Sequence, residues 1–382
     1  MLTHPLWIDE LSADERAALD PGVPQDLDRR PDVLVVGGGM LGLATALACR
    51  RAGLGRVVVV ESARVGAGPS GSAAGLLTPE AHVGLDPPAF VEMGRRSLGR
   101  WRELDAEVPG IGLSDLDVVV LEPHSGRFAT DPSGTATPLE ADEVARRVPG
   151  LQGRYEGTLL PGQARINPLR ALSAMARSFG AVATGAGLQS VETRGGRITA
   201  VRTGSGRLEP GSVVFCTGGP PSGFGLQLDV SASWMRGHLL VTEPAPYRLP
   251  GRVDPICTQL PDGRLLVGGS LDAGATTPEV DPSIVEGIRA WLVSALPWAE
   301  SLPVSHAWCC FRPLHADEMF VVDRIPGVDN AWFTSGHFRT GVIMAPVVGD
   351  GLADWMADGK PSPALEPFSA ARLAAGPDEG RG

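Results

Sequence analysis

Residues 306–323, HAWCCFRPLHADEMFVVD, place two adjacent cysteines and an arginine in a run that alternates like a β-strand. The guanidinium of Arg312 is planar and always charged, so it can hold a carboxylate through two parallel hydrogen bonds. The thiols of Cys309 and Cys310 point to opposite faces, because neighbouring side chains alternate along a strand. At most one of the two thiols can therefore face a given ligand. A structural ion pair with an acidic residue is the alternative role for Arg312.

A glycine-rich turn near the N-terminus indicates a second kind of chemistry. The apolar run DVLVV (32–36) is followed by GGGMLG, which fits G-x-G-x-x-G with Gly37, Gly39 and Gly42. Such glycines permit a tight turn, a close approach of backbone N–H groups to a pyrophosphate, and close packing of a helix on a strand. Glu61 ends the next apolar run, RVVVVE, where its carboxylate can accept a hydrogen bond from a ribose hydroxyl. The pattern predicts a dinucleotide site but does not separate NAD from FAD.

The composition limits the partners. The chain has 382 residues, and 43% of them are hydrophobic. This length exceeds the size that one hydrophobic core usually reaches, so we predict two domains. A formal net charge of −11 favours small-molecule partners over nucleic acid or an anionic membrane. The N-terminus lacks the apolar stretch of a signal peptide, and no segment reaches 18 uninterrupted apolar residues, so we expect a cytoplasmic protein. Five scattered cysteines predict neither a disulfide framework nor a metal site. Lys360 is the one lysine, which nearly excludes Schiff-base chemistry.

The elements that must position these residues follow from hydrophobic periodicity. Residues 1–31 are expected to form an extension with a short helix near 10–19, packed on the outside through Leu6 and Trp7. Residues 62–86 are rich in Gly, Ser and Ala and predict a loop. Further helices are expected at 87–108, 138–148, 167–180, 283–296 and 340–359, and further strands at 181–184, 188–193, 197–203, 212–216, 233–243, 254–260, 264–271, 304–313, 319–323 and 331–335.

Several segments together resemble the D-amino acid oxidase family of flavoproteins, which includes glycine and sarcosine oxidases. They are GAGPSGSAAGLLTPE, VVFCTGG, MRGHLLVTEP, DGRLLVGGS and SGHFRTGVIMAP, in that family's order and at its distances, over about 31–369. The glycine-oxidase-like branch is the most similar. The resemblance implies a mixed α/β (α+β) fold with a Rossmann-like FAD-binding domain and an interleaved antiparallel-sheet substrate domain. It divides the chain into an N-terminal extension (1–30), an FAD-binding domain (31–86, 157–226 and 318–369) and a substrate domain (87–156 and 227–317).

The same resemblance implies FAD as the cofactor and assigns residues to it. Arg312 and Arg339 match positions that hold the substrate carboxylate. A helix beginning at Thr340 and Gly341 would direct its unpaired amides at an electron-rich group and so favour reduced flavin. The residues expected to bind FAD are Gly37, Gly39, Met40, Gly42, Glu61, Ser62, Ser72, Ala73, Ala74, Gly75, Leu76, Leu188, Thr217, Gly218, Cys310, Gly336, Arg339, Thr340, Gly341 and Val342.

Two interpretations of Cys310 stay open. On the sarcosine oxidase pattern, this residue falls where FAD is attached through a cysteine sulfur, so the cofactor would be covalent. The alternative is that Cys309 and Cys310 are both small buried hydrophobic residues.

Departures from the family bear on oxygen and on the substrate. Sarcosine oxidases carry a lysine beside the flavin for oxygen reduction, and the matching residue here is Leu266. Another cation or a histidine would have to act instead, with His337 and His238 as candidates and structural roles as their alternative. The family's tyrosine before this hairpin is also missing, since 256–260 reads ICTQL. Thr258 and Gln259 are expected to face a pocket for a larger or unusual amino acid.

The expected reaction is oxidation of an amine next to a carboxylate. Hydride transfer to FAD gives an imine, which water hydrolyses to an oxo product and an amine or ammonia, with O2 as acceptor and H2O2 released. The alternatives are a flavin dehydrogenase with a quinone or protein acceptor, a nicotinamide dehydrogenase, and a non-catalytic flavin-binding subunit. The oligomeric state is left open.

Overall fold

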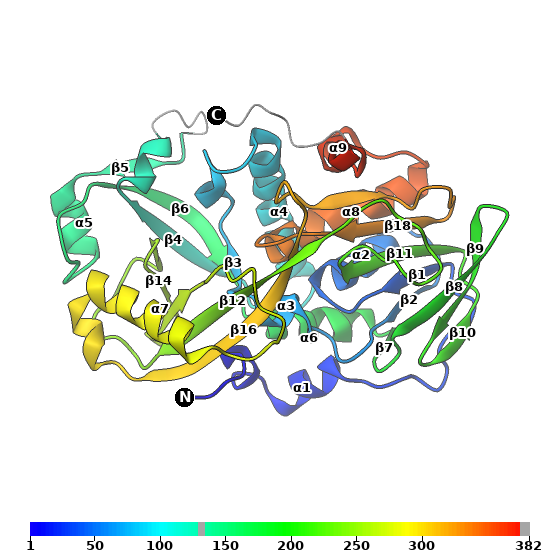
Figure 1. Ribbon diagram of the computed structural model, residues 1–382, viewed down its shortest axis with the longest axis horizontal. Coiled ribbons are helices and arrows are strands. Elements are labelled where there is room, and N and C mark those ends of the chain that lie inside the picture. The colour runs from blue at the N-terminus through cyan, green and yellow to red at the C-terminus, as the bar shows by residue number, and fades with distance from the viewer. Residues whose placement is uncertain (129–133, 375–382) are drawn as a thin grey trace.

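The computed structural model describes residues 1–128 and 134–374 (Figure 1). Its first sheet has six strands in the order β17-β18-β11-β1-β2-β7. All neighbouring pairs are parallel except the antiparallel pair of β17 and β18. The strands are β1 (Val33–Val36), β2 (Val57–Val60), β7 (Val182–Ala183), β11 (Ser212–Gly218), β17 (Val321–Arg324) and β18 (Ala331–Ser335). This is the sheet expected of a dinucleotide-binding fold.

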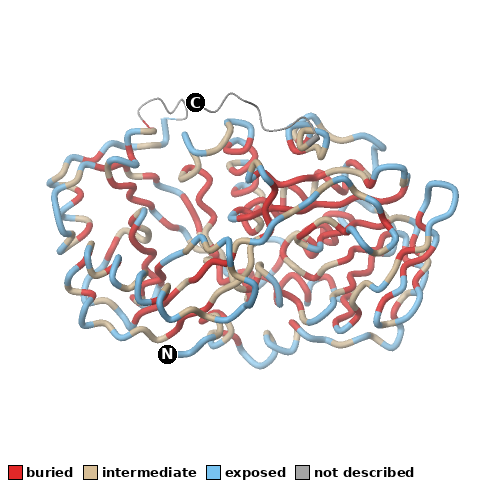
Figure 2. Tube along the Cα trace, viewed as in Figure 1, coloured by how far each residue is buried: buried red, intermediate tan, exposed pale blue. Residues whose placement is uncertain are grey.

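Strand alternation divides this sheet between two cores. Val33 and Val35 of β1 face a core shared with helices, whereas Leu34 and Val36 face a core shared with a three-stranded sheet. The helices are α2 (Met40–Arg51), α6 (Pro168–Phe179), α8 (Gly341–Asp358) and α4 (Pro88–Glu107), and the small sheet contains β8 (Leu188–Arg194), β9 (Arg197–Thr203) and β10 (Gly206–Leu208). Figure 2 shows buried chain along the strands of both halves and exposed chain in the outer loops.

A second sheet of nine strands forms the other half of the molecule. The order is β16-β12-β15-β14-β13-β4-β6-β3, with β5 paired to β6. The strands are β3 (Leu76–Leu77), β4 (Ser114–Leu121), β5 (Thr137–Leu139), β6 (Gly157–Arg165), β12 (Ser233–Thr242), β13 (Arg252–Asp254), β14 (Cys257–Gln259), β15 (Leu265–Gly268) and β16 (Val304–Leu314). One face packs on α5 (Ala141–Arg147) and α7 (Pro282–Ala295). Figure 1 shows these two helices at one end of the molecule and the three-stranded sheet at the other.

The N-terminal extension packs as expected. Leu6 and Trp7 are buried in the main core, and Ser12 caps α1 (Ala13–Leu19) in a capping box with Glu15. Leu2 also forms a bridge with His306 of β16, so the extension is attached to the nine-stranded sheet. The remaining short elements are η1 (Leu6–Ile8), α3 (Pro69–Ser72), η2 (Pro79–His82), η3 (His124–Phe128), η4 (Pro297–Ser301), η5 (Pro363–Phe368) and α9 (Ala371–Ala374).

The mixed α/β fold class is confirmed, and five strands were not anticipated, namely β3, β4, β5, β6 and β10. Strands β4 and β6 were not predicted, although they pair over most of their length. Residues 157–165, assigned above to the FAD-binding domain, form β6 of the nine-stranded sheet. The short strand β3, from the segment expected to be a loop, joins β6 there. The division into two discontinuous domains stays a proposal, and its 87–156 segment includes residues 129–133, which lie outside the described residues.

Candidate active site

The glycine-rich turn between β1 and α2 has the geometry of a pyrophosphate cradle. Gly37 has a φ of +114°, and a Cβ there would lie 2.4 Å from the carbonyl oxygen of Cys216. A Cβ at Gly42 would lie 1.8 Å from the carbonyl oxygen of Gly37. The turn therefore leaves no room for larger residues at these two positions, and it keeps the N-terminal end of α2 open. Ser70 Oγ accepts the Met40 N–H at 3.0 Å, which brings the loop after β2 over the turn.

Glu61 is held in place at the carboxyl end of β2. Its Oε2 accepts the Gly38 N–H at 2.6 Å, and its Oε1 accepts the Ala63 N–H and the Ser62 hydroxyl, both at 2.9 Å. A carboxylate oxygen accepts more than one hydrogen bond, so these contacts fix the group and leave lone pairs for a ribose hydroxyl. The position fits the role predicted from the sequence.

These residues line a cavity of about 630 Å³ at the carboxyl ends of β1, β2 and β11. Ligands of open parallel sheets bind at this edge. Thirteen residues from the predicted site line it: Gly37, Gly39, Met40, Glu61, Ser62, Ala73, Leu188, Thr217, Gly218, His337, Arg339, Gly341 and Val342. Gly42 packs behind the turn, as its contact with Gly37 shows.

Two tryptophans position the loop that borders this cavity. Trp308 Nε1 donates to the Ser72 carbonyl at 2.9 Å, and Trp7 Nε1 donates to the Ala73 carbonyl at 2.8 Å. The two indoles meet edge to face with centroids 6.1 Å apart. The N-terminal extension and β16 therefore hold the small-residue loop jointly. Sequence reasoning expected Trp7 to pack but did not assign it this contact.

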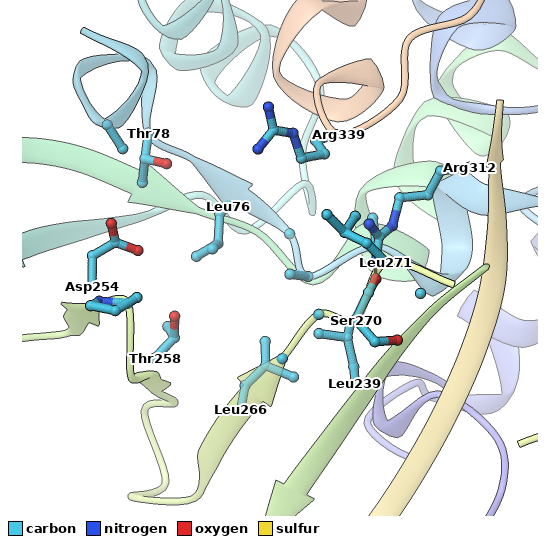
Figure 3. Close-up of a pocket in the computed structure, with 18 of the residues that line it drawn as sticks. Leu76, Thr78, Leu239, Asp254, Thr258, Leu266, Ser270, Leu271, Arg312 and Arg339 are labelled. Atoms are coloured by element: carbon cyan, nitrogen blue, oxygen red, sulfur yellow. Dashed lines mark hydrogen bonds between the residues drawn. The ribbon is translucent and has the colours of Figure 1, made fainter. Parts of the chain in front are cut away.

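A second cavity of about 830 Å³ adjoins the first. The two share five lining residues: Pro69, Ala73, Phe338, Arg339 and Val342. Ser72, Ala74, Gly75, Leu76, Cys310 and Arg312 from the predicted site line the second cavity. Figure 3 shows Arg312 and Arg339 approaching it from the same side. The cradle for a dinucleotide and the two arginines therefore line two adjoining cavities.

Arg312 is half-buried in the wall of the second cavity, and two glycines make room for its guanidinium. Its Nη2 donates to the Ser270 carbonyl at 3.0 Å. A Cβ at Gly237 would lie 1.5 Å from Nη2, and a Cβ at Gly269 would lie 2.7 Å from it. Burial is the main cause that lowers the pKa of Arg312, and the charge of Arg339 adds to it. The guanidinium nevertheless stays charged. The described residues give it no acidic partner, so the structural ion pair considered from the sequence is not formed.

Arg339 is more exposed, and it shares an aromatic neighbour with Arg312. The Cζ atom of Arg339 lies 5.1 Å from the centroid of the Phe338 ring, and that of Arg312 lies 5.9 Å from it. Arg339 Nη2 is 3.8 Å from Glu318 Oε2, and its side chain is 46% exposed. This loose surface pair leaves its guanidinium available to an anion in the cavity.

Cys309 and Cys310 face opposite sides of β16, as expected. Cys310 lines the second cavity, whereas Cys309 Sγ donates to the Pro278 carbonyl at 3.2 Å. Burial raises the pKa of Cys310 to about 11, so its thiol is protonated at neutral pH and is a poor nucleophile. All five cysteines, which lie within the described residues, are free.

The start of α8 contributes to both cavities. Gly341 and Val342 line the first, and Val342 and Ile343 line the second. Pro346 lacks an N–H and so leaves the Val342 carbonyl without its helical partner, and Trp101 Nε1 donates to that carbonyl at 3.0 Å. The unpaired amides of this helix end therefore have a fixed position beside the cavities. Thr340 and Gly336 do not line either cavity.

The two candidate histidines are neutral. His337 lines the first cavity, its Nε2 is 2.7 Å from Thr334 Oγ1, and burial lowers its pKa to about 3. His238 does not line either cavity. Its Nε2 accepts the Asp281 N–H at 3.1 Å, its Nδ1 is 3.0 Å from Ser270 Oγ, and burial lowers its pKa. Neither ring supplies a cation to the site at neutral pH.

The far wall of the second cavity contains residues that sequence reasoning only partly found. Thr258 and Leu266 line it, whereas the Gln259 amide is turned away to bond the backbone of Leu249, Tyr247 and Gly263. Arg252 and Asp254 also line it and were not predicted. They are two residues apart in β13, so their side chains share one face of the strand. Nothing in the local sequence connected that face to the cavity.

Elsewhere in the described part of the chain, His4, Asp9 and His306 have the composition of a small metal site. Their contacts are those of a hydrogen-bonded cluster, because one oxygen of Asp9 lies 2.9 Å from Nε2 of His4 and the other lies 2.9 Å from Nε2 of His306. No described helix has the length and apolar character needed to cross a membrane.

The comparisons with known proteins agree with the geometry. The family model described as FAD dependent oxidoreductase (DAO) matches residues 32–355. A glycine oxidase of Bacillus licheniformis is 28% identical over 351 residues, which cover 85% of this chain and 93% of that protein. The bifunctional protein ThiO/ThiG of Synechocystis sp. is 26% identical over 364 residues, which cover 90% of this chain but only 54% of that protein. The crystal structure of L-proline dehydrogenase from P. horikoshii has a TM-score of 0.81 at 17% identity, over 92% of this chain and 99% of that one. With a cradle, a ribose acceptor and small loop residues that fit FAD, the chain belongs to the DAO family of FAD-dependent oxidoreductases.

Proposed function

We propose that this enzyme oxidises the C–N bond of an amino acid or an N-substituted amino acid. The observation that carries the proposal is the guanidinium of Arg312, which has no acidic partner among the described residues and lies in the wall of the cavity next to the nucleotide cradle. A cation in that position suits a carboxylate. The similarity to a glycine oxidase, which extends over most of both chains, supports the same substrate class.

Bound FAD supplies the chemistry by accepting a hydride from the substrate α carbon. Arg312 and Arg339 hold the carboxylate and so orient the C–H bond. Their charges disfavour the ammonium form of the substrate, which promotes loss of the proton that the amine must give up. The product imine then takes up water to give an oxo acid and an amine or ammonia. Neither His337 nor His238 acts as the base in this scheme, because burial lowers the pKa of His337 to about 3 and so makes it a weak base, and His238 does not line the cavities.

The predicted cofactor residues that line the cavities keep their roles in this proposal. Gly37 and Gly39 would hold the pyrophosphate, Glu61 would accept a hydrogen bond from the ribose, and the amides at the start of α8 would stabilise negative charge on reduced flavin. Cys310 forms part of the wall without a bond to FAD, because its thiol is protonated.

We further propose O2 as the electron acceptor, with H2O2 released and with Arg312 or Arg339 as the cation beside the flavin. A dehydrogenase with a quinone or protein acceptor is the second candidate. Leu266, in the place of the lysine of sarcosine oxidases, favours it because it adds no charge to the cavity wall. The family match to FAD-dependent oxidoreductases argues against the nicotinamide enzyme and the non-catalytic subunit. We propose a cytoplasmic location, with neither nucleic acid nor membrane as a partner.

The experiment mixes the purified flavoprotein with amino acids and N-methyl amino acids without oxygen and follows the flavin absorbance. Bleaching by carboxylate-bearing amines, and not by the matched amines without a carboxylate, is the expected result. Equal bleaching by both sets contradicts the carboxylate site. Oxygen consumption compared with dye reduction under air then separates the oxidase from the dehydrogenase.

A further inference from the structure

The second cavity extends well beyond the two arginines. Figure 3 shows Arg312 and Arg339 on one side, and Thr78, Asp254 and Thr258 on the other. Apolar side chains from three strands lie in the stretch between them, namely Leu76, Leu239 and Leu266. A ligand anchored by its carboxylate on the arginine side would pass along apolar walls before it reached polar groups again.

The charges at the distal end neutralise each other. Arg252 Nη2 donates to Asp254 Oδ1 at 2.5 Å, and Arg252 Nη1 donates to Thr258 Oγ1 at 3.1 Å. Arg127 Nη2 lies 3.9 Å from the other oxygen of Asp254, and the carboxylate of Asp86 is a second negative charge acting on Arg127, so two carboxylates balance the two guanidiniums. The side chains of Arg252 and Asp254 are only 21% and 18% exposed, so water screens the attraction between their charges only weakly.

Because these charges balance, the distal end of the cavity discriminates between ligand groups by their charge. A second carboxylate would have to compete with Asp254 for Arg252, and an ammonium group would lie near two guanidiniums. Breaking a partly buried ion pair leaves one charge uncompensated, which is costly. An uncharged polar group avoids this cost, because Thr258 accepts from Arg252 and its own hydroxyl hydrogen is left, among the described residues, for a ligand.

From this arrangement we propose that the substrate carries a second, uncharged hydrogen-bonding group, such as a carboxamide or ureido group, at the end of an apolar stem. Thr258, Asp254 and Arg252 form the subsite for that group. Glycine and sarcosine, which lack a stem, leave the subsite unused. The inference rests on the proposed oxidation of amino acids and names the substrate class within it.

The test measures anaerobic flavin reduction by matched amino acids, with both enantiomers of each chiral one. The set contains glycine, sarcosine, norleucine, glutamate, lysine, asparagine, glutamine and citrulline. The best uncharged polar substrate should exceed norleucine, glutamate and lysine in kcat/KM by about tenfold or more, since a pocket that hydrogen-bonds its ligand rejects analogues without the group. If glycine or a charged amino acid is the best substrate, the subsite is refuted and the proposed function survives. If no amino acid reduces the flavin, the proposed function itself fails.

Two variants separate the subsite from a general effect on folding. Thr258→Val keeps the side-chain shape and should lower the ratio of glutamine to norleucine kcat/KM by about tenfold. Asp254→Asn frees Arg252 and should raise the ratio of glutamate to glutamine by about tenfold. Thr199→Val, at an exposed position of β9 where Thr199 Oγ1 donates to the Glu192 carbonyl, is the matched control and should change neither ratio. Unchanged ratios in both folded subsite variants overturn the proposal.

Discussion

A single added methyl group at Gly237 should disable the carboxylate site while leaving the fold intact. A Cβ at this position would lie 1.5 Å from Nη2, 2.2 Å from Cζ and 2.7 Å from Nε of Arg312. The backbone of β12 can accept alanine there, because Gly237 is not among the glycines of positive φ. The three atoms nearest to the methyl group all belong to the end of the flexible Arg312 side chain, so the guanidinium must leave its place.

The magnitude follows from the two hydrogen bonds that the guanidinium offers. Each bond to a charged group contributes about 1.5–3 kcal/mol. Loss of both corresponds to about 3–6 kcal/mol, or on the order of 10²–10⁴-fold in kcat/KM at 1.4 kcal/mol for each factor of ten. We expect Gly237→Ala to lie in this range for carboxylate-bearing amines and to affect amines without a carboxylate far less.

The assay compares rates of anaerobic flavin reduction for such matched substrates in the wild type and the variant. Gly99→Ala is the control, because Gly99 is exposed in α4 and a Cβ there meets nothing within 4 Å. Equal thermal stability of the two variants shows that folding is not the cause. Wild-type kinetics for Gly237→Ala with an amino acid would refute the placement of the substrate carboxylate at Arg312.

Three further results are expected. Trp7→Phe removes the donor to the Ala73 carbonyl and should weaken FAD binding about fivefold in a flavin titration. Trp298→Phe is the control, because its indole donates to the distant Pro149 carbonyl, and it should leave FAD affinity unchanged. Equal FAD affinities of the two variants would contradict a role of the Trp7–Ala73 hydrogen bond in cofactor binding. Because the Cys310 thiol is protonated, denaturation should release all flavin, and flavin retained on a peptide containing this residue would prove attachment. The pKa of His337 is lowered in the folded protein, so the unfolded state takes up its proton first. The free energy of unfolding should then fall as the pH drops from about 6.5 toward 3, by up to about 1.4 kcal/mol per unit, and less in His337→Asn; parallel urea-denaturation curves would exclude this.

The nucleotide half of the site was predictable from local sequence. The strand, glycine turn, helix and Glu61 lie within about 30 residues, and each step has a strong local signal. Strands β4 and β6 gave weaker signals. Asp115 and Asp117 interrupt the start of β4, and β6 contains Pro161 and Gly162. Their pairing joins residues far apart in the sequence, so the register could not be deduced locally.

The substrate half depends on long-range pairing. Arg312 was found by its motif, but the space it needs comes from Gly237 on the neighbouring strand. Arg252 and Asp254 enter the same cavity because β13 lies in the nine-stranded sheet, between β14 and β4. His238 was a reasonable candidate by type and position, yet it alternates with Gly237 and therefore faces away from the cavity.

The central claim is that FAD and an anchored carboxylate occupy the two adjoining cavities between the glycine cradle and Arg312. A crystal structure of the flavoprotein with a non-reacting aromatic carboxylate tests this most directly. We predict the ring system between the Ala73 loop and the start of α8, with the carboxylate within hydrogen-bonding distance of the Arg312 guanidinium. A carboxylate bound elsewhere, or a ring system outside the two cavities, would contradict the account.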